Sequence, residues 1–200
     1  MKKLAVLVSG RGSNMLALVD ACEQGRLQAT VELVVSNNAD SLALVSAKER
    51  GIAVAHLSSR THPDADALDV AMKESFEKHQ VDYVLLAGFM KKIGSKTLSA
   101  YKNRMVNVHP SLLPKFGGKG MFGLNVHKAV IQAGEKETGV TIHLVNAEYD
   151  EGAILAQEKV EVVEEDTAES LAAKVLKVEH ALFAETIQKI IDGSIILPVE

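Results

Sequence analysis

The fold is indicated first by residues 4–14, which read Leu4-Ala5-Val6-Leu7-Val8-Ser9-Gly10-Arg11-Gly12-Ser13-Asn14. Five aliphatic residues in a row are typical of a strand that is buried on both faces. The next segment, Asn14 to Gln24, carries apolar residues at helical spacing, and a second aliphatic run follows from Val31 to Ser36. This order predicts two parallel strands joined by a crossover helix.

The same alternation continues along the chain. Ile52 to Leu57 predicts a strand, Asp64 to His79 a helix, and Tyr83 to Ala87 another buried strand. Met105 to Val108 predicts the next strand. Alternation of this kind predicts an α/β fold, with a mostly parallel, twisted sheet covered by helices on both faces.

The last third of the chain has a different pattern. Residues 138–145 alternate, and residues 153–163 form a long β-rich segment whose Glu158, Glu161 and Glu164 indicate a solvent-exposed side. We therefore expect these late strands to be antiparallel or at an edge. Asp166 or Thr167 can cap a long final helix that ends at Gly193. The sequence contains no repeat or linker, which favours a single domain over residues 1–200.

Composition narrows the functional classes. The chain has 200 residues, 47% hydrophobic and 24% charged, which suits a globular domain with a substantial core. Its net charge of -4, scattered along the chain, gives no basic footprint for nucleic acid. The single cysteine, Cys22, lies in a helical pattern and is expected to be structural. The first apolar run, ending at Ser9-Gly10, is too short to cross a membrane and lacks a signal-cleavage pattern, so we expect a cytoplasmic protein.

Two polar residues end the strand predicted at residues 105–108. Asn107 and His109 are two positions apart, so their side chains share one face, and Pro110 fixes the chain after them. An amide donor beside a protonatable ring can stabilise an oxyanion in acyl transfer. The alternative is that His109 is a hydrogen-bonded structural residue.

The turn after the first strand is a candidate phosphate site. Gly10 to Asn14 lies between a strand and a helix, where backbone N–H groups and the helix dipole can hold an anion. The alternative is a tight turn with Ser13 or Asn14 as the N-cap. NAD is disfavoured, because Met15 stands where the dinucleotide fingerprint needs glycine and residues 36–38 supply no acidic residue.

The sequence also resembles a known family. Residues 107–114, read with Asp150, resemble the signature of the folate-dependent formyltransferases, which is Asn-x-His-Pro-Ser-Leu-Leu-Pro followed by a distant aspartate. The resemblance implies a Rossmann-like fold and transfer of the formyl group of 10-formyltetrahydrofolate to the amine of 5′-phosphoribosylglycinamide in purine biosynthesis. It further implies that Asn107 and protonated His109 stabilise the oxyanion, while Asp150 orients His109 and helps to move protons.

The resemblance extends to the binding residues. It implies a phosphate-binding amino-terminal half, about residues 1–100, and a folate-binding and catalytic half, about residues 101–200. The matched positions for the substrate phosphate and ribose are Gly12, Ser13, Asn14 and Glu179. Those for the folate are Met90, Lys91, Lys92, Ile93 and Asn107. The histidines and Cys22 form no metal-ligand pattern, so we expect no metal, and the scattered charge and the short first apolar run predict no nucleic-acid or membrane partner. We expect a monomer or weak homodimer.

Three departures from the family pattern concern the ligands and the loop beside them. Lys91 replaces a usual arginine and loses its bidentate fork, and Ala65 occupies the place of a second arginine. The glycine-rich segment from Lys115 to Gly123 is longer than the usual loop. His143 is expected to be a supporting or core residue.

Other functions remain open at this point. A formyltetrahydrofolate hydrolase or a sugar-nucleotide formyltransferase would use the same three residues, although such relatives usually carry an additional domain for which 200 residues leave no room. An alternative from another functional class is a non-catalytic folate-binding or nucleotide-binding domain. Such a domain would lack at least one of the three residues, whereas Asn107, His109 and Asp150 are all present.

Overall fold

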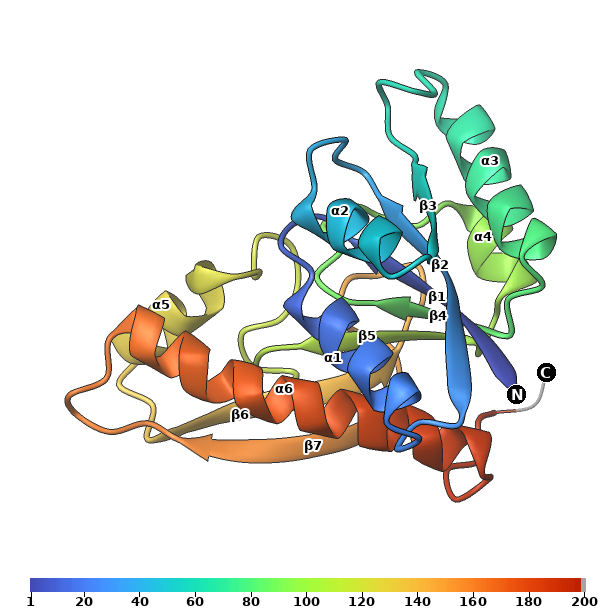
Figure 1. The fold of residues 1–200 in the computed structure, drawn as a ribbon. Helices are drawn as coiled ribbons and strands as arrows, with labels where there is room; N and C mark the ends of the chain where they lie inside the picture. The colour runs from blue at the N-terminus through green and yellow to red at the C-terminus, as the bar shows by residue number, and fades with distance from the viewer. Residues whose placement is uncertain (199–200) are drawn as a thin grey trace.

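The computed structural model describes residues 1–198, which form one seven-stranded sheet of order β3-β2-β1-β4-β5-β6-β7 (Figure 1). The first five strands pair in parallel, and β6 and β7 pair antiparallel at one edge. The expected mostly parallel sheet with a late antiparallel edge strand is confirmed. The strands are β1 (Lys2–Val8), β2 (Ala29–Ser36), β3 (Ala53–His56), β4 (Tyr83–Leu86), β5 (Met105–His109), β6 (Glu137–Leu144) and β7 (Ile154–Glu161).

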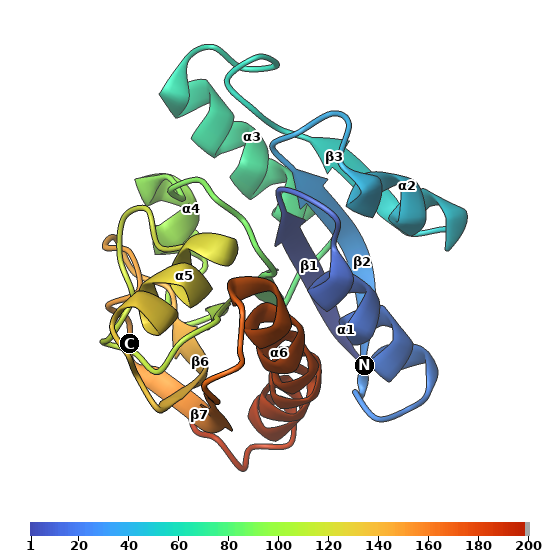
Figure 2. The same cartoon turned by 90° about the vertical axis from the view of Figure 1, so that its left-hand side faces the viewer.

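Helices cover both faces of the sheet, as expected. Helices α1, α2, α5 and α6 contribute to one buried apolar cluster, and α3 packs in a second cluster on the other face, next to α4. The long α6 lies between α1 and the β6–β7 pair (Figures 1 and 2). The helices are α1 (Ser13–Glu23), α2 (Leu42–Glu49), α3 (Ala65–Lys78), α4 (Ser95–Ala100), α5 (Leu124–Gln132) and α6 (Ala168–Ile191).

The sequence pattern did not predict three of these helices, namely α2, α4 and α5, which are the shortest. Helix α4 shows why local sequence is insufficient. Its first N–H groups are capped by the buried carboxylate of Asp69 from α3, which accepts from Lys96 N at 2.8 Å and Thr97 N at 3.0 Å. A cap supplied from 27 residues away leaves no signature in the local sequence.

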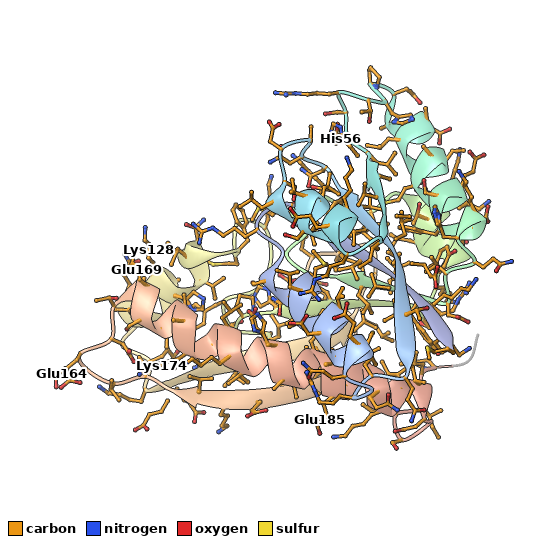
Figure 3. All side chains as sticks on the ribbon, in the orientation of Figure 1. His56, Lys128, Glu164, Glu169, Lys174 and Glu185 are labelled. Atoms are coloured by element: carbon orange, nitrogen blue, oxygen red, sulfur yellow. The ribbon has the colours of Figure 1, made fainter. Side chains whose placement is uncertain are left out.

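The ends of α6 and the character of β7 agree with the sequence. Thr167, not Asp166, is the N-cap and forms a capping box with Ser170. Gly193, at φ 82°, follows the helix in the left-handed conformation that ends helices. Glu158, Glu161 and Glu164 are exposed, and Glu164 projects from the loop after β7 (Figure 3). Cys22 is half-buried, and burial raises the pKa of its thiol to about 11.

The polar side of β6 is buried rather than solvated. Val140 and Ile142 face the apolar core, while Thr141 and His143 alternate with them and are equally enclosed. The turn that follows β5 covers this polar side, since Leu113 N donates to Thr141 Oγ1 at 3.0 Å. The alternation along β6 therefore marks a polar layer beneath the end of β5.

Candidate active site

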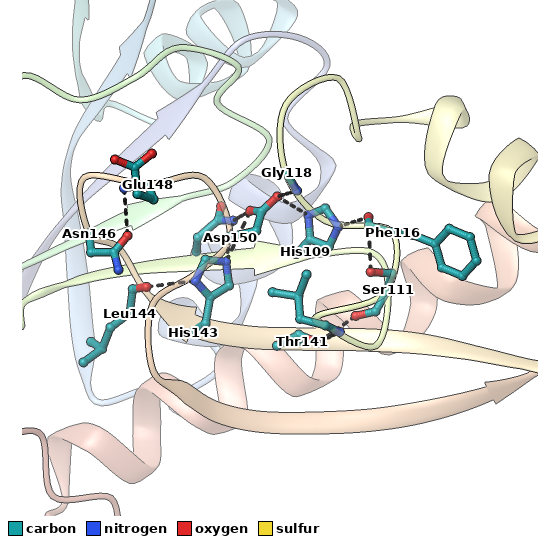
Figure 4. A network of polar contacts seen from close by, with 12 residues as sticks. His109, Ser111, Phe116, Gly118, Thr141, His143, Leu144, Asn146, Glu148 and Asp150 are labelled. Carbon is teal, nitrogen blue, oxygen red and sulfur yellow. Dashed lines mark hydrogen bonds and ion pairs between the residues drawn. The ribbon is translucent and has the colours of Figure 1, made fainter.

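Asn107, His109 and Asp150 meet at the carboxyl end of β5. Strand β5 carries Asn107 and His109, and Asp150 comes from the loop between β6 and β7. Asp150 Oδ1 lies 3.5 Å from Asn107 Nδ2, and Asp150 Oδ2 lies 3.5 Å from His109 Nδ1. The two side chains predicted to share a face therefore reach one carboxylate. Figure 4 shows the contact of His109 with Asp150.

His143 sets the orientation of the Asn107 amide. Its Nδ1 lies 2.8 Å from the carbonyl oxygen of Leu144, which can only accept, so Nδ1 carries the hydrogen in the neutral ring. His143 Nε2 is then an acceptor for Asn107 Nδ2 at 3.0 Å. The Asn107 amide is thus held with its nitrogen toward Asp150. His143 therefore supports Asn107, in agreement with the supporting role expected for it.

His109 is held at both ring nitrogens. Its Nε2 donates to the carbonyl oxygen of Phe116 at 2.8 Å, and its Nδ1 faces Asp150. Burial lowers the pKa of His109, although Asp150 and the Phe116 carbonyl act in the opposite direction. Burial alone would raise the pKa of Asp150, but His143, whose Nε2 lies 3.5 Å from Asp150 Oδ1, the charge of His109 and the N–H of Gly118 hold it below its usual value. A carboxylate is therefore present beside an imidazole that can take up a proton.

The candidate phosphate loop leaves the start of α1 open. The N-cap is Gly12 and not Ser13 or Asn14, and within residues 1–198 no side chain caps this end. Asn14 does not cap the helix because its amide reaches α6. Two features require glycine at position 12. Its φ is +80°, and a Cβ there would lie 2.5 Å from Ala43 Cβ. The first-turn N–H groups have no partner within the helix and can hold an anion.

Glu179 reaches the same loop from α6. Its Oε2 accepts from Asn14 Nδ2 at 2.7 Å, and only 8% of the residue is exposed. Burial raises the pKa of the Glu179 carboxyl to about 7, and the Asn14 hydrogen bond only partly offsets this. A buried carboxyl beside the phosphate loop can bind hydroxyl groups of a ligand.

This raised pKa predicts a pH-dependent stability. Between pH 4.5 and about 7 the folded chain holds a proton that the unfolded chain releases, so the free energy of unfolding falls as pH rises through this window. Above it, ionised Glu179 opposes folding by roughly 3 kcal/mol. Glu179→Gln keeps an acceptor for Asn14 without the charge.

We expect Glu179→Gln to be more stable than the native protein at pH 8 and nearly equal to it at pH 4, measured by urea unfolding across pH. Glu185→Gln is the matched control, because Glu185 is an exposed glutamate of the same helix (Figure 3). Parallel pH dependences for the native and Glu179→Gln proteins would contradict the buried-carboxyl account.

Two cavities meet at the trio. A cleft of about 1030 Å³ runs from residues 10–14, past Met90 and His109, to Glu179. A smaller cavity of about 70 Å³ is lined by Lys91, Lys92 and Ile93 among others. The residues that line both cavities are Phe89, Asn107, Tyr149 and Asp150. Such a junction at the carboxyl edge of an open sheet is where ligands bind.

The positions considered for folate binding differ in their surroundings. Lys92 bridges to the loop before Asp150, since its Nζ lies 3.5 Å from Glu148 Oε2 and 5.3 Å from the centre of the Tyr149 ring. Lys91 is exposed and free to meet a carboxylate at the cavity mouth. Ala65 begins α3 and lines neither cavity.

Sequence reasoning missed several lining residues of the large cleft: Arg11, His127, Tyr149 and Glu169. Arg11 is an exposed cation within the glycine turn, and a cation in a candidate phosphate loop could have been recognised from the sequence as a lining residue. His127 is 4% exposed, and its Nδ1 has no hydrogen-bond partner in the described part of the chain. Burial, then the nearby His109, lower its pKa. It was missed because α5 was not predicted.

Residues 1–198 contain no group of three or more His, Cys, Asp or Glu side chains arranged to hold a metal ion. They also contain no helix long and apolar enough to cross a membrane.

The fold and the site define an open α/β protein whose cleft is equipped for transfer of a group at carbonyl carbon. A family model described as "Formyl transferase" matches residues 2–187, and the chain belongs to this family. It is 43% identical over 97% of its length to "Phosphoribosylglycinamide formyltransferase, chloroplastic" of Arabidopsis thaliana, of which it spans 67%.

A bacterial relative and a solved structure agree. The chain is 37% identical over 96% of its length to "Phosphoribosylglycinamide formyltransferase" of Haemophilus influenzae, of which it covers 89%. It superposes on glycinamide ribonucleotide transformylase 1 from Symbiobacterium toebii with a TM-score of 0.92 and 36% identity, over 99% of this chain and 91% of that one. The structural similarity therefore extends over the whole described fold.

Proposed function

We propose that the chain transfers the formyl group of 10-formyltetrahydrofolate to the primary amine of 5′-phosphoribosylglycinamide, giving the formylated product and tetrahydrofolate in purine biosynthesis. The relatives above carry the names of this activity. The observation that carries the proposal is the meeting of Asn107, His109 and Asp150 where a large and a small cavity join. Two substrates that meet at this junction would bring their reacting groups beside the trio.

The trio supplies the chemistry of the proposed reaction. As the neutral amine attacks the formyl carbon, a C–N bond forms and the carbonyl oxygen becomes negative; Asn107 Nδ2 and protonated His109 Nδ1 donate to that oxygen. Burial lowers the pKa of His109 in the free protein. The negative charge that develops on the oxyanion then favours the protonated form of His109 in the transition state. Asp150 stabilises the imidazolium and, through water, takes a proton from the attacking nitrogen and delivers one to the folate nitrogen as the old C–N bond breaks.

The two ends of the site suit the two substrates. The N–H groups after Gly12, together with Ser13 and Asn14, would hold the phosphate, and Glu179 the ribose hydroxyls. Met90 to Ile93, with Asn107, would contact the folate, where Lys91 and Lys92 face its glutamate carboxylates.

The division of the chain follows from this placement. We infer one formyltransferase domain over residues 1–200, of which 199–200 lie outside the described residues, with the phosphate site mainly in the first half and the catalytic trio in the second. We further infer a monomer or weak homodimer, located in the cytoplasm, that uses no metal and no NAD.

The test is the rate of tetrahydrofolate release from 10-formyltetrahydrofolate with and without the ribonucleotide. We expect release to require the ribonucleotide and to fall about 100-fold in His109→Ala, the usual effect of removing one oxyanion donor. Release with water alone would instead favour a hydrolase. Absence of release under both conditions would leave a binding domain or another formyl acceptor.

A further inference from the structure

Ser111 is the third polar side chain of the motif at residues 107–114, and it is fully buried. Its hydroxyl donates to the carbonyl oxygen of Lys115 at 2.6 Å and lies 3.4 Å from that of Phe116. Figure 4 shows the Phe116 carbonyl between the His109 ring and the Ser111 hydroxyl. The serine therefore holds the piece of backbone that holds His109.

This backbone has an unusual conformation that needs support. Phe116 has φ 55°, a left-handed value that is uncommon for a residue other than glycine. Its side chain packs against the apolar core, and its carbonyl turns back to accept from His109 Nε2 at 2.8 Å. Since a carbonyl only accepts, Nε2 must carry the hydrogen, and Nδ1 is left as the nitrogen that titrates toward Asp150.

The turn that carries Ser111 is itself anchored. Thr141 is fully buried on β6, and its hydroxyl donates to the carbonyl oxygen of Ser111 at 2.6 Å. The same hydroxyl oxygen accepts from Leu113 N at 3.0 Å and from Gln157 Nε2 at 2.8 Å. Ser111 is thus fixed to β6 and β7 and can transmit a fixed geometry to Phe116.

We propose that Ser111 is a positioning residue for formyl transfer, holding through the Lys115–Phe116 backbone the ring of His109 so that Nδ1 faces Asp150 and the cleft. The kinetic part of this inference rests on the proposed function, whereas the ring geometry does not depend on it. Ser111 acts through the backbone and lines neither cavity.

Removal of the hydroxyl has two expected consequences. The Phe116 carbonyl is free to turn away, so the ring loses its alignment, and errors of about 1 Å in such sites cost about 10- to 100-fold in rate. A carbonyl acceptor also favours the imidazolium, so its loss lowers the pKa of His109. The other titratable groups facing this ring, Asp150, His143 and His127, are unchanged by the substitution.

The experiment compares the native chain with Ser111→Ala. We expect kcat/KM to fall about 10- to 100-fold, with the decline of activity at high pH moving to lower pH. If Ser111 were only structural, Ser111→Ala would lower the melting temperature and leave the pH of the decline in activity unchanged. Ser36→Ala is the matched control, because Ser36 is a fully buried serine at the end of β2 that lines neither cavity.

Nitrogen-15 NMR of the histidine rings tests the geometry without substrate. In the native chain neutral His109 should be the Nε2–H tautomer, and Ser111→Ala should shift its tautomer balance while Ser36→Ala leaves it unchanged. A native Nδ1–H tautomer, or an unchanged His109 ring and pH profile in Ser111→Ala, would overturn the proposal. If the native chain transfers no formyl group but shows the expected tautomer change, the proposed function fails and the positioning role of Ser111 stands.

Discussion

Asp150→Asn is expected to lower kcat about 10,000-fold, the scale seen when the carboxylate behind a catalytic histidine becomes an amide. Asparagine has nearly the same shape and can still accept from Gly118 N, which lies 2.8 Å from Asp150 Oδ2. The substitution removes the negative charge that faces His109 Nδ1 at 3.5 Å, and it removes the proton acceptor. Both losses act on the transition state, so the KM values should change little.

Glu148→Gln is the control for this variant. Glu148 belongs to the same loop and is exposed, and among residues 1–198 its carboxylate pairs with Lys92 alone, at 3.5 Å, so its loss should change kcat less than tenfold. Single-turnover measurements across pH separate the chemical step from product release. A loss below tenfold in Asp150→Asn would show that proton transfer and imidazolium stabilisation do not depend on Asp150.

The sequence predicted the sheet because its signals are local. Residues 4–8 and 84–86 are short aliphatic runs, and such runs predict buried parallel strands whatever lies around them. The spacing of Asn107 and His109 likewise required only the strand period. The distant Asp150 came from the family resemblance, since no spacing rule links a strand residue to a residue of a distant loop.

The remaining features depend on partners far away in the chain. Gly12 displaces Ser13 as the N-cap because α2 packs against the turn, and α2 was not predicted. The buried polar side of β6 likewise depends on the turn after β5, whose Leu113, 28 residues before Thr141, donates to the Thr141 hydroxyl. Tertiary contacts of this kind override local preference, and they concentrate where the site is built.

Gly12→Ala is expected to lower kcat/KM for the ribonucleotide about 1,000-fold. A Cβ at this position would lie 2.5 Å from Ala43 Cβ and 3.1 Å from Ala43 Cα, while the φ of +80° disfavours any side chain. Overpacking costs about 1–3 kcal/mol, and the left-handed conformation adds about 1–2 kcal/mol. The turn can relieve this strain only by moving, and the first N–H groups of α1 then no longer converge on a phosphate.

Gly10→Ala is the matched control two residues earlier. A Cβ on Gly10 meets nothing within 4 Å, and this residue is not among the glycines with positive φ. We therefore expect Gly10→Ala to keep near-native kinetics and melting temperature, while Gly12→Ala raises the KM for the ribonucleotide and leaves that for the folate nearly unchanged. Equal effects of the two substitutions, or an effect of Gly12→Ala on the folate alone, would place the phosphate elsewhere in the cleft.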